Sequence, residues 1–314
     1  MGNRLHIMAI YELKDGVGII PEGTAVIEES AFQECKELTS IVIPDSVTKI
    51  ENRAFRDCTG LTSIVIPDSV KEIGSSAFSG CTGLTSIVIP DSVTEIGNGA
   101  FKGCKGLTSI VIPDSVTKIG DWAFEGCMGL TSIVIPDSVT KIGDWAFEGC
   151  MGLTSIAIPD SVTKIGEDAF KGCSGLTSIV IPDSVTMIGD GAFECCTGLT
   201  SIVVSEGNEV YDSRGNCNSI IKTATNELIA GCNKTVIPDS VTEIGEKAFF
   251  GCTSLTSIVI GNSVTEIGNW VFNRCTGLQT INVPTKKADY YKKRLPEELH
   301  HLIVELPEEK NAKK

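Results

Sequence analysis

Cysteine is the most abundant residue in this sequence that could support redox or metal chemistry. There are thirteen cysteines in 314 residues. If cysteines that recur at a fixed interval occupy neighbouring strands, their Cα atoms lie ~4.8 Å apart, which is within disulfide range. Their side chains would be parallel, however, and would not converge to form a bond. No C-x-x-C is present to begin a zinc site. We predict buried, apolar thiols rather than oxidised pairs or metal ligands, with Cys195 and Cys196, Cys217 and Cys232 as the likelier exceptions. Ten cysteines form one column: Cys35, Cys58, Cys81, Cys104, Cys127, Cys150, Cys173, Cys196, Cys252 and Cys275.

Aspartate forms a second column, and repeated carboxylates along one edge could bind Ca²⁺. Each aspartate follows a proline and precedes a serine, which is a turn signature in itself. Calcium-binding solenoids carry glycine-rich motifs with two carboxylates per turn. We therefore predict a turn and no metal or other cofactor. The column contains Asp45, Asp68, Asp91, Asp114, Asp137, Asp160, Asp183 and Asp239.

Catalytic groups are scarce. The three histidines, His6, His300 and His301, lie near the chain ends, where we expect a capping role. The sequence contains no H-E-x-x-H, G-x-S-x-G or G-x-x-x-x-G-K-[ST] motif. We predict that the protein has no catalytic residues and is not an enzyme.

A repeated unit must position all of these residues. The segment "LTSIVIPDSVTKIGDWAFEGCMG" at 107–129 recurs letter for letter at 130–152, and similar units begin 23 residues apart. This period is typical of solenoids, in which stacked units share one core. Leu107, Ile110 and Ile112 should point inward from a strand that ends at Pro113, because proline removes a ladder donor. A second extended piece should follow, then a short helix or 3₁₀ turn that buries Phe124.

This unit resembles the BspA-like (Treponema pallidum type) bacterial leucine-rich repeats, because the Leu, Phe and Cys columns stay in phase. The resemblance implies a right-handed, curved repeat solenoid of the leucine-rich-repeat type, mostly β, with parallel strands and a binding role. We expect one continuous domain divided into an N-terminal cap (1–14), regular repeats (15–198), an irregular repeat with an inserted hairpin (199–231), regular repeats (232–277), a C-terminal cap (278–306) and a disordered tail (307–314).

Charge and hydropathy exclude several classes of partner. The net charge of −14 argues against nucleic acid, which is bound through basic patches. No apolar run approaches the ~18 residues of a transmembrane helix, so no membrane insertion is expected. The start "MGNRLHIMAI" lacks an apolar signal core. The sequence as it stands predicts a cytoplasmic monomer, or a cell-surface or secreted protein if a leader was removed.

The repeats differ mainly after the glycine that follows the second extended piece. Trp122, Trp145 and Trp270, the three tryptophans of the protein, all occupy this column. Tryptophan is a frequent interface anchor, although these positions could also vary simply because nothing constrains them. The concave strand face should instead be a uniform ladder of Thr, Ser and Val. We therefore take as the candidate binding edge Lys118, Asp121, Trp122, Glu125, Lys141, Asp144, Trp145 and Glu148.

These observations predict a non-catalytic repeat scaffold that binds a protein or another macromolecule. The resemblance suggests adhesion to host or matrix proteins, or to partner bacteria. An intracellular scaffold is the alternative, and an enzyme or a calcium-binding solenoid is less favoured.

Overall fold

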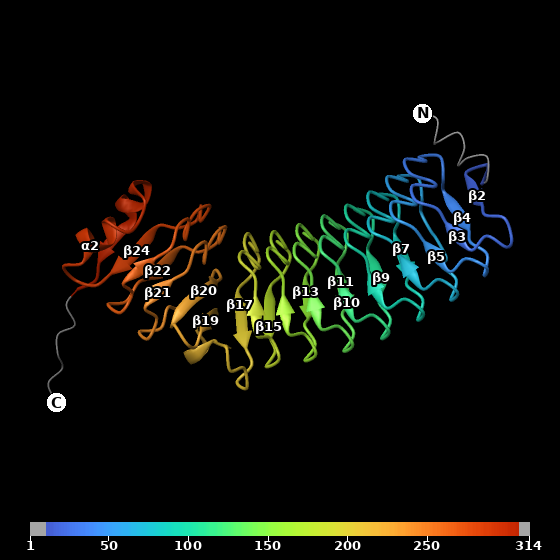
Figure 1. Ribbon diagram of the computed structural model, residues 1–314. Helices are drawn as coiled ribbons and strands as arrows, with labels where there is room; N and C mark the ends of the chain where they lie inside the picture. Colours follow the sequence, from blue (N-terminus) through green and yellow to red (C-terminus); the bar gives the residue numbers. More distant parts are fainter. Residues whose placement is uncertain (1–10, 308–314) are drawn as a thin grey trace. The chain divides into compact units, whose positions relative to one another are not determined.

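The computed structural model describes residues 11–307, and these residues form stacked turns of parallel strands (Figure 1). The chain divides into two compact units. Unit 1 contains the described residues up to Leu176 together with Met187–Phe193, and unit 2 contains Thr177–Thr186 and the described residues from Glu194 onward. Most of the expected N-terminal cap, including His6, and residues 308–314 of the expected tail lie outside the described residues.

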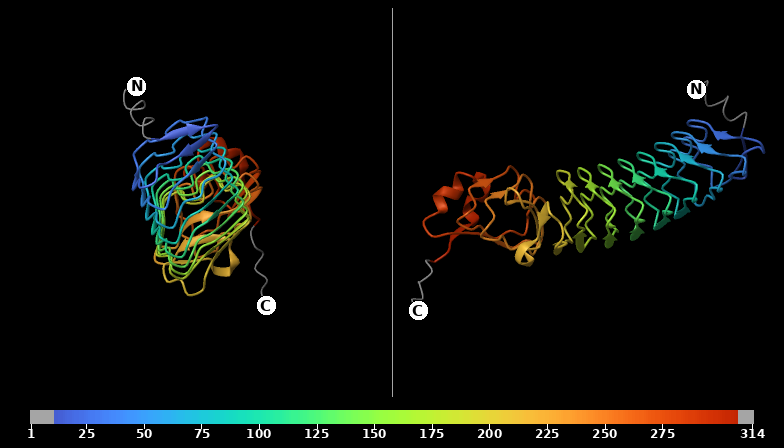
Figure 2. Two further views of the ribbon diagram at one scale, coloured as in Figure 1. Left: turned by 90° about the vertical axis from the view of Figure 1, so that its right-hand side faces the viewer. Right: turned by 60° about the horizontal axis from the view of Figure 1, so that its bottom comes forward.

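Unit 1 is built from repeats that contribute a strand of about three residues and a strand of two residues. The short strands form an eight-stranded parallel sheet in the order β16-β14-β12-β10-β8-β6-β5-β3. Its register advances by one repeat per strand, so that Lys118 pairs with Lys141. Seen from one end, the turns of unit 1 overlie one another (Figure 2). The strands are β1 (Glu12–Lys14), β2 (Val17–Ile19), β3 (Val26–Ile27), β4 (Ser40–Val42), β5 (Lys49–Ile50), β6 (Glu72–Ile73), β7 (Ser86–Val88), β8 (Glu95–Ile96), β9 (Ser109–Val111), β10 (Lys118–Ile119), β11 (Ser132–Val134), β12 (Lys141–Ile142), β13 (Ser155–Ala157), β14 (Lys164–Ile165) and β16 (Met187–Ile188).

Unit 2 continues the parallel pattern and adds an antiparallel hairpin. Strands β19 and β20 form this hairpin, and β20 then pairs in parallel with β21. Helices α2 and η2 precede the last strand, which pairs with β24. The elements are β15 (Ser178–Ile181), β17 (Ser201–Val204), β18 (Tyr211–Asp212), η1 (Arg214–Asn216), β19 (Ser219–Lys222), β20 (Glu227–Gly231), β21 (Glu243–Ile244), β22 (Ser257–Val259), β23 (Glu266–Ile267), β24 (Thr280–Val283), α2 (Ala288–Lys292), η2 (Glu297–Leu302) and β25 (Ile303–Glu305).

The core of unit 1 contains a column of stacked phenylalanine rings. Consecutive rings from Phe32 to Phe193 have centroids 5.2–5.6 Å apart. Phe124 and Phe147 are fully buried, as are Leu107 and Val116 of the inward columns. The inward positions predicted from the repeat are therefore confirmed, and the parallel-strand solenoid class with them.

The cysteine column is buried beside the phenylalanines, as predicted. Twelve of the thirteen cysteines are buried, and Cys195 is partly exposed. The Cys150 Sγ donates to the carbonyl oxygen of Phe124, 3.2 Å away. That same carbonyl accepts the backbone N–H of Cys127 at 3.1 Å. The thiols therefore fill space and also hydrogen-bond to backbone of the preceding repeat, a role that the spacing alone did not predict.

The segment 121–126 is a series of turns, not the helix or 3₁₀ turn predicted for it. Trp122 and Gly126 have positive φ values of 56° and 69°, which no right-handed helix permits. Their N–H groups donate to the next repeat, Trp122 to the carbonyl of Asp144 at 2.9 Å and Gly126 to that of Glu148 at 2.7 Å. Bonds between repeats thus alternate with local turn bonds, such as that from the Glu125 N–H to the Trp122 carbonyl at 3.1 Å. Among the described residues, the helical elements are η1, α2 and η2.

The Pro-Asp-Ser turn is closed by backbone. The Val116 N–H donates to the Pro113 carbonyl at 3.0 Å, and the Ser115 hydroxyl donates to the carbonyl of Val93 at 2.6 Å. Serine therefore connects the repeats here, while Asp114 is exposed. Within residues 11–307, no group of three or more His, Cys, Asp or Glu side chains is arranged to hold a metal ion. No helix in that range is long and apolar enough to cross a membrane.

Candidate functional site

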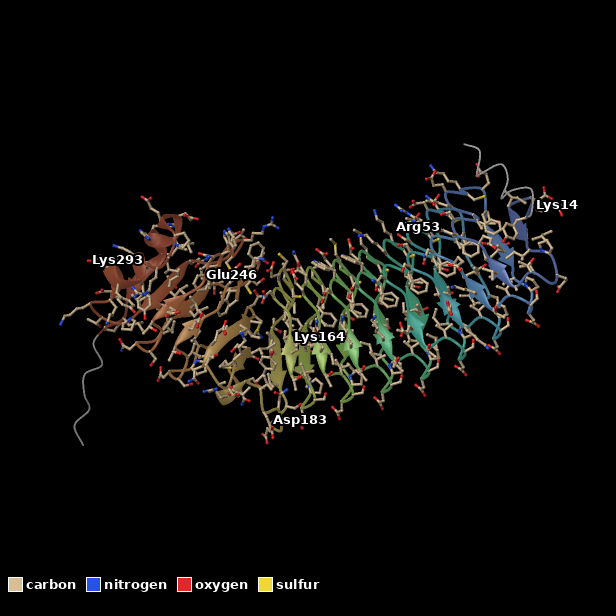
Figure 3. All side chains as sticks on the ribbon, viewed as in Figure 1. Lys14, Arg53, Lys164, Asp183, Glu246 and Lys293 are labelled. Carbon is tan, nitrogen blue, oxygen red and sulfur yellow. The ribbon has the colours of Figure 1, made fainter. Side chains whose placement is uncertain are left out.

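The variable column that contains the tryptophans has a left-handed backbone in every repeat of unit 1. We call it the left-handed edge, and its φ values run from 49° to 66°. Figure 3 shows one member, Arg53, on the outside of the turns. A left-handed φ costs an L-residue roughly 1–2 kcal/mol, whereas glycine adopts it freely. The position is therefore constrained, and tryptophan is not the residue that its backbone favours. The edge comprises Ser30, Arg53, Ser76, Gly99, Trp122, Trp145, Asp168 and Gly191.

Trp122 and Trp145 form a stacked pair on this edge. Their ring centroids are 5.1 Å apart and their planes differ by 4°. Trp122 is 38% exposed, which agrees with the predicted exposure. Trp145 is only half-buried rather than exposed, because Trp122 covers one of its faces. The pair presents one accessible ring, supported from behind by the second.

Asp168 fixes the position of Trp145. The indole Nε1–H of Trp145 donates to Asp168 Oδ2 at 3.1 Å, and the Lys171 ammonium donates to the same oxygen at 2.9 Å. Asp168 is 8% exposed, and these two donors satisfy its buried carboxylate oxygen. Neither Asp168 nor Lys171 was among the residues predicted for the binding edge. The repeat period could have identified Asp168, since it stands 23 residues after Trp145.

Asp121 and Asp144 are structural residues on this edge. The Asp121 Oδ1 accepts the backbone N–H of Asp144 at 3.0 Å, and the Asp144 Oδ1 accepts that of Glu167 at 3.0 Å. Asn98 performs the same function one repeat earlier, toward the N–H of Asp121. Each side chain thus satisfies a backbone donor of the following repeat. Their charge still contributes to the site, but their carboxylates are committed to the scaffold.

This arrangement predicts different effects for two replacements of Asp144. Asp144→Asn should change the free energy of unfolding by less than about 0.5 kcal/mol, because the amide oxygen can accept the same bond. Asp144→Ala should destabilise the protein by about 1 kcal/mol, because the Glu167 N–H loses its acceptor. Urea unfolding of both variants measures the difference, and equal destabilisation would contradict the assigned role.

Glu125, Lys141 and Glu148 each lie within 4.0 Å of an oppositely charged group. Glu125 lies 2.6 Å from the Lys102 ammonium, and the Lys141 ammonium lies 3.9 Å from Asp121. Burial raises the pKa of the Glu148 carboxyl, while Lys171 opposes this rise.

Lys118, like Lys141, lies in a strand, whereas the other candidate residues lie in turns. It is half-buried in β10, next to Lys141 in the sheet. The candidate set therefore includes strand residues as well as the turn residues around the tryptophans.

The strand face of unit 1 carries a stripe of exposed valines, flanked by the Thr and Ser positions that were predicted. The exposed fractions lie between 58% and 78%. Contiguous exposed apolar surface is a feature of interaction sites, and covering each valine would contribute about 1 kcal/mol. The stripe is uniform from repeat to repeat, so its side chains cannot distinguish one repeat from another. It consists of Val42, Val65, Val88, Val111 and Val134.

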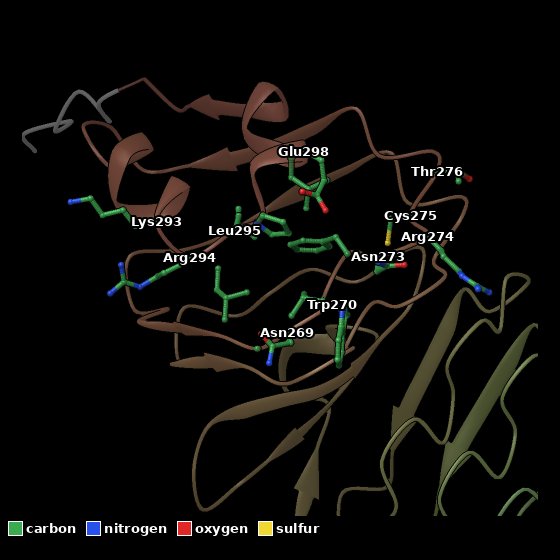
Figure 4. A pocket seen from close by; sticks show the side chains of 16 residues that line it. Asn269, Trp270, Asn273, Arg274, Cys275, Thr276, Lys293, Arg294, Leu295 and Glu298 are labelled. Atoms are coloured by element: carbon green, nitrogen blue, oxygen red, sulfur yellow. The ribbon is translucent and has the colours of Figure 1, made fainter.

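Unit 2 contains a separate hollow of about 760 Å³ between 267–276 and 293–299 (Figure 4). Trp270 borders it and is 55% exposed. The side chains of Arg274, Lys293 and Arg294 point away from its centre in Figure 4. Arg294 is engaged elsewhere, since it stacks on the ring of Tyr290 at 3.6 Å. The hollow therefore offers apolar surface without a cation directed into it.

Comparison with known proteins gives a consistent result. The pattern described as the BspA type Leucine rich repeat region matches residues 18–131, 94–222 and 229–295. The structure resembles that of a leucine rich cell surface protein from Faecalibacterium prausnitzii, with 28% identity, coverage of 91% of this chain and 96% of that chain, and a TM-score of 0.52.

Two further solved structures are similar. A leucine-rich repeat protein from Eubacterium ventriosum is 28% identical, with coverage of 65% of this chain and 61% of that chain and a TM-score of 0.53. The pneumococcal vaccine antigen PcpA shares the fold at 24% identity, with coverage of 86% and 67% and a TM-score of 0.61. Comparison with curated protein sequences gives no match.

Proposed function

Because the chain belongs to the BspA-type leucine-rich repeat family, we propose that it is a non-catalytic scaffold that binds another protein through the left-handed edge at Trp122 and Trp145. The observation that carries this proposal is the stacked pair itself. Both rings occupy positions where the backbone favours glycine. Large, rigid aromatic side chains at low entropic cost are common anchors of protein interfaces.

The location of the pair supports selectivity. The valine stripe repeats almost unchanged, so it can add contact area but cannot fix where along unit 1 a partner docks. The tryptophan pair occurs once in unit 1, at two adjacent repeats. A partner that contacts both surfaces would gain affinity from the valine stripe, and the tryptophan pair would fix its position along unit 1.

The proposed partner is a host or matrix protein, or a surface protein of another bacterium. The Faecalibacterium prausnitzii relative is described as a cell surface protein, which favours this adhesive function. The column of buried cysteines, which we expect to be reduced, favours an intracellular scaffold instead, because thiols persist in reducing compartments. The two functions differ in the source of the partner and share the same edge.

Removing the pair should abolish most of the binding. We expect the double variant Trp122→Gly/Trp145→Gly to lose about 2 kcal/mol or more of binding free energy, roughly 30-fold in Kd, if the rings are hot spots. Glycine suits the left-handed backbone, so the fold should be retained. The immobilised chain would first capture partners from matrix and bacterial extracts, and the affinity of each purified partner would then be measured.

The matched control is Trp270→Gly, a third tryptophan at an equivalent left-handed position in unit 2. It should bind as the parent does. Unchanged affinity of the double variant, with an unchanged melting temperature, would refute the proposal and direct attention to the valine stripe.

A further inference from the structure

One face of the Trp122 ring is left open by the column in which it stands. Trp145 covers the other face at 5.1 Å. The preceding member of the left-handed edge is Gly99, which has no side chain to stack on the indole. The nearest atoms to a Cβ built at Gly99 belong to Ser76 and Lys102. The aromatic stack therefore ends at Trp122. The next repeat contributes no side chain at Gly99, and the one after it contributes only the small side chain of Ser76.

The open position fits a planar group. Neighbouring repeats lie ~4.8 Å apart, so a flat group placed above Gly99 would continue the stack begun by the two indoles. An aliphatic chain or a branched side chain would fill this space less completely.

The charges around the open face favour a cation. The two repeats that contain the tryptophans carry four carboxylates, those of Asp121, Glu125, Asp144 and Glu148. The neighbouring lysines lie beside carboxylates: the ammonium of Lys102 lies 2.6 Å from Glu125, and that of Lys141 lies 3.9 Å from Asp121. The ammonium of Lys171 lies 2.9 Å from Asp168, and Lys118 pairs with Glu95 in the sheet. The face of an indole also attracts cations through its quadrupole.

We infer that the open face of Trp122 receives the guanidinium group of an arginine in a basic segment of the protein partner. Arginine combines a planar, permanently charged head with the ability to stack on aromatic faces, whereas lysine presents a compact, strongly hydrated charge. The nearby carboxylates supply the complementary charge. This inference rests on the proposed function and names the chemistry of its partner.

Selective ¹⁵N-labelling of the tryptophan indoles provides the test. The three indole signals would be assigned with Trp122→Phe, Trp145→Phe and Trp270→Phe. The labelled chain would then be titrated with a capped peptide of alternating Gly and Arg, and with counterparts that carry citrulline, lysine or tyrosine in place of arginine. We expect the Trp122 signal to shift, the Trp270 signal to stay, and the arginine peptide to bind about fivefold more tightly than the citrulline peptide.

The outcomes separate this inference from the proposed function. Equal binding of the citrulline peptide, tighter binding of the tyrosine peptide, or arginine binding that persists in Trp122→Gly would each overturn the inference. If the peptides fail in this way while Trp122→Gly/Trp145→Gly still loses its protein partner, the proposed function stands and the arginine assignment falls. If the arginine peptide shifts Trp122 but the double variant keeps its partner, the ring binds arginine without being the docking site of that partner, and both the proposed function and the inference fall.

Discussion

Phe147→Ala should destabilise unit 1 by about 3–5 kcal/mol, the range for removing a buried aromatic ring. Phe147 is fully buried and stacks on Phe124 and Phe170, with centroids 5.3 and 5.4 Å away. Removing the ring would leave a cavity in a column where each ring contacts only its two neighbours. Because a solenoid has no larger core that could repack around the cavity, we expect the full destabilisation. Chemical denaturation followed by circular dichroism measures the change.

Met151→Ala is the control for this prediction. Met151 lies four residues further along and is 52% exposed. Its replacement should change stability by less than about 0.5 kcal/mol, as most surface substitutions do. A loss for Phe147→Ala that is no larger than the loss for Met151→Ala would mean that the ring column does not hold the repeats together.

In the native protein at pH 8, one cysteine should react rapidly with Ellman's reagent and the other twelve slowly. Cys195 is the partly exposed thiol, and the remaining cysteines are buried. Burial raises the pKa of Cys58, Cys127 and Cys173 to about 12. At pH 8 such a thiol is ionised roughly once in ten thousand molecules, and only the thiolate is nucleophilic. All thirteen thiols should react once the chain is unfolded.

The same pKa values predict how stability depends on pH. A thiol whose pKa is raised by folding stabilises the native state fully below its unfolded value near 9. This contribution is lost as the pH rises toward about 12. The denaturant concentration at the unfolding midpoint should therefore decrease as the pH rises above about 9. Rapid reaction of several thiols in the native state at pH 8 would show that the cysteine column is not sealed.

The repeat made much of the fold predictable from the sequence. Leu107, Ile110 and Phe124 recur at a fixed period, so one unit read correctly gave the inward positions of its neighbours. The strand ending at Pro113 and the second extended piece at Lys118 followed from local turn chemistry and periodicity. These features depend on residues close together in one unit or separated by whole periods.

The features that escaped prediction depend on backbone conformation and on contacts between repeats. The segment 121–126 contains residues compatible with a helix, but alternate N–H groups, beginning with that of Trp122, bond to the next repeat. Its left-handed φ values cannot be read from residues as different as Trp122 and Asp168. Asp144 was predicted as a contact residue because it varies. Its bond to the Glu167 N–H became visible only with the two repeats in register.

Hydroxyl-radical footprinting of the chain, alone and bound to a purified protein partner, tests the central claim most directly. Trp122 is exposed and Trp270 provides an internal reference in unit 2. The account predicts that partner binding suppresses oxidation of Trp122 and of the peptide containing Trp145, while oxidation of Trp270 stays the same. Unchanged oxidation of Trp122 in the saturated complex would contradict it and would place the binding surface elsewhere on the chain.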